Sequence, residues 1–71
     1  MIRHGFIRSE LGKWYSLNEI LNFSIKDETD YEGYICFDIV AVDKNNEFIY
    51  ISENHKTLEK AQEHLDKIMN G

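Results

Sequence analysis

The chain has 71 residues, a formal net charge of −5 and one cysteine. This length supports a single domain, residues 1–71, and at this size one apolar core supplies only about 3–5 kcal/mol of stability. With Cys36 as the single cysteine, an intrachain disulfide is excluded. A lone thiol in an apolar segment is typical of a buried side chain in a reducing compartment.

The charge is unevenly distributed along the chain. Residues 1–26 carry four basic and two acidic side chains (+2), whereas residues 27–71 carry four and eleven (−7). An acidic body repels phosphate backbones, so nucleic acid is not the expected partner; a basic protein partner or ordinary solubility is compatible with it. There is no apolar run near 18 residues and no secretory signal stretch, so we expect a cytoplasmic protein with no membrane partner.

Two short strands are expected near the N-terminus. Residues 5–8 (GFIR) and residues 13–17 (KWYSL) contain the aromatic and β-branched side chains that favour strands, and a turn around Gly12 separates them. The chain has no proline and four glycines, so its turns must be made by Asn, Asp and Gly. This part of the sequence has the weakest periodicity.

The segment SLNE offers a helix start within otherwise extended chain. Ser16 and Glu19 have the spacing of a capping box, which predicts a single helical turn ending near Leu21, before extended chain resumes at residues 22–26. The alternative is one strand with a kink at Asn18. The sequence leaves both open.

An acidic loop is predicted between this extended chain and the long strand that follows. Residues 27–33 (DETDYEG) are polar and end in glycine, which favours a loop. The ligand spacing, central glycine and final glutamate of a calcium-binding EF-hand loop are absent. We therefore interpret the segment as solvated, or as a contact for a basic partner. Its carboxylates are Asp27, Glu28, Asp30 and Glu32.

Residues 34–42 and 48–52 predict an antiparallel hairpin. Both segments are rich in β-branched and aromatic residues, with an apolar period close to two. Residues 43–46 (DKNN) form the turn, where Asn46 tolerates a left-handed backbone conformation. The register predicted from this turn places Asp43 opposite Glu47, Ala41 opposite Ile49, Ile39 opposite Ile51, and Phe37 opposite Glu53.

A C-terminal amphipathic helix is predicted after Thr57, a suitable N-cap. Its apolar side chains recur at three- and four-residue steps, which places them on one stripe. These residues are Leu58, Ala61, Leu65, Ile68 and Met69. A helix of about twelve residues spans roughly 18 Å and matches the aliphatic face of the hairpin. The fold class is therefore α+β: an antiparallel β-meander of four or five strands with one C-terminal helix packed on one face.

The other face of the hairpin is the predicted partner-binding surface. The residues assigned to it are Tyr34, Asp38, Phe48 and Tyr50. An aromatic patch that stays uncovered is typical of a protein contact. Asp38, surrounded by aromatic rings, is a candidate for a raised pKa, but a lone carboxylate is weak support for a catalytic site. We interpret it as facing solvent or as hydrogen-bonded to a tyrosine hydroxyl.

Motifs for catalysis, metal binding or nucleotide binding are not found. Zinc requires at least three converging ligands, and the HExxH spacing is absent. His55, Glu59 and Glu63 fall one turn apart only if the helix begins early, and a cap at Thr57 leaves His55 outside it. Cys36 and the histidines form no nucleophile pattern. We therefore expect no cofactor, no metal and no enzymatic activity.

A meander of strands ending in the threonine-capped helix KTLEKAQEHL resembles the arm-binding domains of phage-type integrases. The likeness rests on GKW at residues 12–14 and on the T-x-x-x-A step from Thr57 to Ala61. Those domains enter DNA grooves with a basic sheet, so the resemblance implies the fold and not, for an acidic sheet, DNA binding. In size and composition the chain also resembles the short acidic uncharacterised proteins of low-GC bacteria and their phages.

Two functions follow from these observations. The first is a non-enzymatic small protein-interaction module whose partner is an unidentified protein or a second copy of the chain. The alternative is a phage-derived acidic inhibitor that mimics nucleic acid toward a basic enzyme, of the anti-restriction or anti-CRISPR type. It is motivated by the −7 of residues 27–71, and it predicts salt-sensitive binding to a basic nuclease. A small enzyme that acts through Asp38 or a histidine has the least support.

Overall fold

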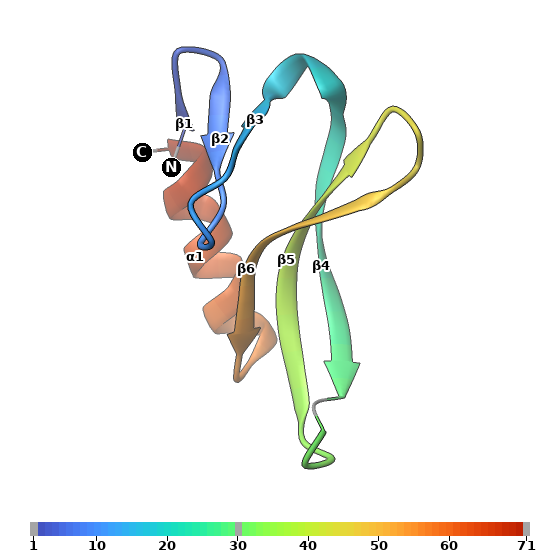
Figure 1. The fold of residues 1–71 in the computed structure, drawn as a ribbon. Coiled ribbons are helices and arrows are strands. Elements are labelled where there is room, and N and C mark those ends of the chain that lie inside the picture. The colour runs from blue at the N-terminus through green and yellow to red at the C-terminus, as the bar shows by residue number, and fades with distance from the viewer. Residues whose placement is uncertain (1, 30, 71) are drawn as a thin grey trace.

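The computed structural model describes residues 2–29 and 31–70, which form two three-stranded antiparallel sheets and a C-terminal helix (Figure 1). The N-terminal sheet contains β1 (Ile2–Arg3), β2 (Phe6–Arg8) and β3 (Trp14–Ser16). The larger sheet is a meander of β4 (Ile20–Thr29), β5 (Ile35–Asp43) and β6 (Phe48–His55), followed by α1 (Leu58–Asn70). The predicted α+β class is confirmed, with six strands among the described residues instead of four or five.

A single turn of 3₁₀ helix, Leu17–Glu19, connects the two sheets. Ser16 is its N-cap, and its hydroxyl accepts a hydrogen bond from the Asn18 N–H at 3.3 Å. The carbonyl of Glu19 accepts a hydrogen bond from the Lys44 N–H at 3.0 Å, which ties this turn to the turn between β5 and β6. The predicted helical turn is confirmed, but it ends at Glu19 and not near Leu21, which already belongs to β4; the kinked strand is not observed.

Strand β4 extends into the segment that was predicted to be an acidic loop. Asp27 and Glu28 belong to β4, whose pairing with β5 continues through Thr29. The prediction of a loop that begins at Asp27 is therefore wrong, because strand pairing outweighs the low strand propensity of acidic residues. Glu32 is exposed in the turn that follows, and Asp30 lies outside the described residues.

The turn between β5 and β6 has the predicted form. One carboxylate oxygen of Asp43 accepts hydrogen bonds from the backbone N–H groups of Asn45, at 2.8 Å, and Glu47, at 2.9 Å. Asn46 has a φ of 62°, the left-handed conformation that asparagine tolerates. Near this turn, Ala41 pairs with Ile49 as predicted.

Farther from the turn, the pairing of β6 with β5 departs from the prediction. Two irregularities shift the register, so Ile39 pairs with Ser52 in place of Ile51, and Phe37 pairs with His55 in place of Glu53. Asn54, within the second irregularity, has a φ of 67°. The predicted register is wrong here because it assumed uninterrupted alternation, whereas a β-bulge places an extra residue opposite one partner.

The core lies between the larger sheet and α1, and β2 contributes to it from the N-terminal sheet. Its buried members come from four elements: Ile7, Ile39, Ala41, Ile51 and Ile68. Both hairpins of the larger sheet supply side chains at alternate positions, as a half-buried sheet requires. The core is therefore small and almost wholly aliphatic.

Helix α1 contacts β4, β5 and β6, so the prediction of a helix packed across one sheet face is confirmed. The Thr57 hydroxyl caps it by accepting a hydrogen bond from the Lys60 N–H at 3.0 Å. Leu58 and Met69 of the predicted stripe stay 55% and 49% exposed, whereas Ala61 and Ile68 of the same stripe are buried. In the part of the chain that the structure describes, no helix has the length and hydropathy to span a bilayer.

Candidate functional site

The face of the larger sheet that points away from α1 carries a mixed set of aromatic and charged side chains. We call it the open face; its residues are Lys26, Glu28, Asp38, Val40, Phe48 and Tyr50. The N-terminal sheet packs on the other side, where Ile7 joins Ile39 and Ile68 in the core. Phe48 therefore stays 52% exposed.

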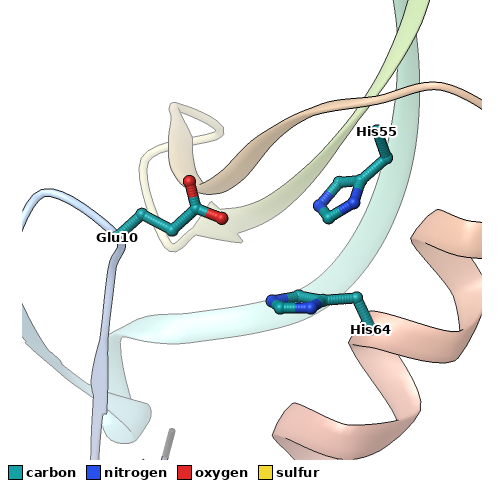
Figure 2. Close-up of side chains that lie close together, drawn as sticks. All are labelled: Glu10, His55 and His64. Atoms are coloured by element: carbon teal, nitrogen blue, oxygen red, sulfur yellow. The ribbon is translucent and has the colours of Figure 1, made fainter.

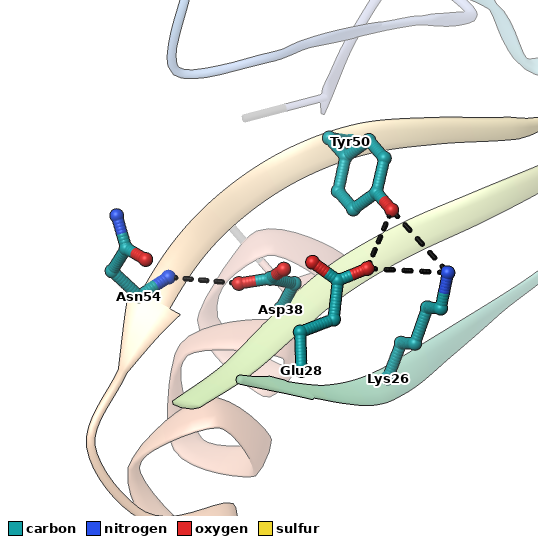
Figure 3. Close-up of polar contacts among 5 residues, drawn as sticks. All are labelled: Lys26, Glu28, Asp38, Tyr50 and Asn54. Atoms are coloured by element: carbon teal, nitrogen blue, oxygen red, sulfur yellow. Dashed lines mark hydrogen bonds and ion pairs between the residues drawn. The ribbon is translucent and has the colours of Figure 1, made fainter. Parts of the chain in front are cut away.

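Three open-face side chains bond to one another (Figure 3). The Nζ atom of Lys26 lies 3.1 Å from Oε1 of Glu28, and the Tyr50 hydroxyl donates to the same oxygen at 2.7 Å. Lys26 Nζ also donates to the Tyr50 oxygen at 3.4 Å and lies 4.7 Å from the ring centroid of Phe48. These residues meet because Lys26 and Glu28 are two positions apart on β4 and share one face. We call the four residues the open-face cluster.

The charges of the cluster support one another. The hydrogen bond from Tyr50 lowers the pKa of Glu28, and Lys26 lowers it further. Conversely, the bond to Glu28 raises the pKa of Lys26, and the same carboxylate raises the pKa of the Tyr50 hydroxyl. At neutral pH the cluster therefore contains a cation, an anion and a neutral phenol. Both charged side chains are about a third exposed, so water screens their attraction.

Asp38 is the most buried charged residue of the open face, with 3% of its surface exposed. Its carboxylate accepts a hydrogen bond at 2.9 Å from the backbone N–H of Asn54, so it holds the second bulge of β6 (Figure 3). Burial raises the pKa of Asp38; the Asn54 N–H opposes this rise, and the Glu28 carboxylate adds to it. Neither predicted alternative is observed: Asp38 is buried and not exposed to solvent, and its partners are the Asn54 backbone and the Glu28 side chain, not a tyrosine hydroxyl.

The four residues predicted as a partner-binding surface do not form one patch. Tyr34, 69% exposed, directly precedes β5, whereas Phe48 pairs with Val42 near the other end of that strand. Asp38 is buried between them, and Tyr50 is linked to Glu28. The sequence analysis assigned no role to Lys26. Lys26 lies two residues before Glu28, and this spacing puts both side chains on one face of a strand, which would have predicted their contact.

A second group of polar side chains lies at the junction of the N-terminal sheet, β6 and α1 (Figure 2). Glu10 comes from the turn between β2 and β3, His55 is the last residue of β6, and His64 lies on α1. One possible ligand atom from each lies within 4.8 Å of the others. The hydroxyl of Ser52 contacts a Glu10 carboxylate oxygen and lies 2.7 Å from Nε2 of His55.

Sequence patterns did not identify this second group. His55 was considered only together with Glu59 and Glu63, and Glu10 lies far from all of them, near the N-terminus of the chain. No local spacing motif relates residues that only the packing of two sheets and a helix brings together.

Comparison of the chain with protein-family models, with curated proteins and with solved structures finds no match. The resemblance to integrase arm-binding domains therefore stays a prediction. Function has to be inferred from the geometry of the two side-chain groups and of the sheet that carries them.

Proposed function

We propose that this chain is a non-enzymatic protein-interaction module that pairs with a second copy of itself through the outer edge of β4. The observation that carries the proposal is the position of this strand. It runs for ten residues at the end of the sheet order β4-β5-β6, and no described strand pairs with its outer side. An edge of this length presents backbone donors and acceptors to another strand.

The side chains of β4 suit a like partner. Lys26 is followed by Asp27 and Glu28, so both charge signs occur close together on the strand. Opposite charges on facing strands stabilise a pair, and two antiparallel copies bring such charges within reach of each other. Leu21, which is 60% exposed, adds apolar surface on β4 itself. Its burial between two copies would supplement a core that is small for an independent domain.

The bonding of the open face supports a binding role over a catalytic one. Catalysis requires polar groups that converge on a substrate within a concave pocket. Lys26, Glu28 and Tyr50 instead use their polar atoms on one another, and Asp38 is buried against the backbone of β6. Most hydrogen-bonding groups of these four side chains are thus already used within the protein, and few remain to bind or activate a substrate.

The acidic-inhibitor alternative has weaker support from the geometry. A nucleic-acid mimic needs carboxylates that stay unneutralised along one surface. Glu28 forms an ion pair with Lys26, and on α1 the exposed acidic residues are interspersed with Lys60 and Lys67. The net charge of residues 27–71 is the observation that still favours the inhibitor. Salt-sensitive binding to a basic nuclease would test this alternative.

Sedimentation velocity over a wide concentration range tests the proposed pairing. We expect the wild-type chain to shift from monomer to dimer as its concentration rises. Ser24→Lys adds a cation next to Lys26 on the β4 edge, where two copies would repel each other, and should remain monomeric. The control, Asn45→Lys, adds the same charge at the exposed turn between β5 and β6 and should dimerise as the wild type does.

Circular dichroism must first show that both variants are folded. A wild-type chain that stays monomeric at every concentration contradicts the proposal. Equal dimerisation of the Ser24→Lys and Asn45→Lys variants would exclude the β4 edge and place the contact elsewhere on the surface.

A further inference from the structure

We propose that Glu10, His55 and His64 form a binding site for a divalent transition-metal ion, with zinc the best match. The inference is independent of the proposed pairing through β4. It rests first on convergence: three side chains from the N-terminal turn, the end of β6 and α1 place ligand atoms within 4.8 Å of one another (Figure 2). The two imidazole ring centroids are 4.9 Å apart.

The ligand types match zinc chemistry. Two imidazole nitrogens and one carboxylate oxygen are a known zinc ligand set, with the fourth position taken by water. Carboxylate and imidazole together do not suit magnesium or calcium, which prefer oxygen ligands alone. Zinc bonds of about 2.0–2.1 Å in a tetrahedral arrangement place ligand atoms roughly 3.3 Å apart.

The three side chains are able to close the remaining distance. Glu10 is exposed and His55 and His64 are half-buried, so each retains some rotational freedom. A cavity of about 210 Å³ adjoins the group and is lined in part by Glu10, Ser52 and His64. This space accommodates a metal-bound water. Arg8 also lines the cavity, and its positive charge lowers the affinity for a cation without occupying a ligand position.

Ser52 supplies the supporting contacts that metal sites commonly use. Its side chain is 1% exposed, and its hydroxyl contacts both the Glu10 carboxylate and Nε2 of His55. This hydrogen bond uses Nε2 of His55, so the ion would bind either Nδ1 of the ring or, in place of the Ser52 contact, Nε2 itself. Two of the three ligands are thereby held beside each other by a buried group.

Isothermal titration of the tag-free, chelator-treated full chain with zinc chloride tests the site. We expect one ion per chain, and no displacement by magnesium. Glu10→Gln and His64→Gln each remove a ligand; loss of a supporting contact alone typically costs about 10–100-fold in affinity, so each should weaken binding at least tenfold. The control is His4→Asn, because His4 is exposed, lies outside the group and has a φ of 52° that asparagine tolerates.

A thermal melt provides a second measurement. Zinc should raise the melting temperature of the wild type and of His4→Asn, because a ligand that binds only the folded state stabilises it, and a chelator should reverse the shift. Glu10→Gln lies in an exposed turn, so it keeps the test valid even where His64→Gln fails to fold. Absence of zinc binding by the wild type, or equal binding by Glu10→Gln, would overturn the proposal.

Discussion

The two faces of the larger sheet are built from the same three strands yet differ in chemistry. The face under α1 contributes aliphatic side chains, such as Ile39 and Ala41, to the buried core. The open face carries Lys26, Glu28 and Tyr50, which bond to one another in partial contact with water. Because side chains alternate along a strand, one sequence specifies both faces independently. On the larger sheet, the face under α1 therefore supplies most of the apolar core, whereas the open face carries the ion pair of β4 and its bond to Tyr50.

The largest expected effect is the difference in unfolding free energy lost when an apolar side chain is truncated on each of the two faces. Ile39 is completely buried, and truncation of such a residue to alanine costs about 2–5 kcal/mol. A domain of this size has little more than that in total, so the Ile39→Ala chain should be largely unfolded. Phe48→Ala on the open face should cost roughly 1 kcal/mol or less, since its ring is already half exposed. Urea denaturation measures both, and equal losses would contradict the division between the faces.

A smaller effect concerns the pH dependence that the open face confers. Burial raises the pKa of Asp38, so the folded chain holds this proton more tightly than the unfolded chain does. Its favourable contribution is therefore complete below the usual carboxyl range and is lost as pH rises through the folded pKa. Asp38→Asn should raise the melting temperature relative to wild type at about pH 7, and the gain should disappear near about pH 3.

Glu28→Gln is the matched control, with the opposite sign. Hydrogen bonds from Tyr50 and Lys26 lower the pKa of Glu28, so its stabilising contribution is present above the unfolded pKa and is lost as pH falls. This variant should be less stable than wild type at neutral pH and should converge with it in acid. The same sign for both variants would contradict the assignment of distinct environments to the two carboxylates.

The smallest expected effect is the change in stability when Asn54, in the second bulge of β6, is replaced. Asn54 has a φ of 67°, a conformation that glycine adopts freely and alanine does not. Asn54→Gly should be as stable as wild type or up to about 1 kcal/mol more stable, whereas Asn54→Ala should lose about 1 kcal/mol. Both variants keep the backbone N–H that bonds to Asp38. Denaturation curves that rank alanine above glycine would show that the side chain of Asn54 has another role.

The parts of the fold that were predictable have local causes. The Thr57 cap, the turn at residues 43–46 and the helical turn after Ser16 each depend on a few neighbouring residues, and all three are confirmed. The bulges of β6 and the extension of β4 depend on pairing with a distant strand, which periodicity does not report. The meeting of Glu10 with His64 depends on the packing of whole elements, so no spacing in the sequence indicated it.

One backbone hydrogen bond bears on how large an assembly can become. The N–H of Glu10 donates to the carbonyl of Ile51 at 2.8 Å, so the turn between β2 and β3 occupies part of the outer edge of β6. A sheet with two free edges can add chains at both ends and grow into a fibre. In the pairing that we propose, two β4 edges bind each other and neither stays open. The partly covered edge of β6 would then be the only edge of the larger sheet left for a further chain, so this pairing favours two chains over a fibre.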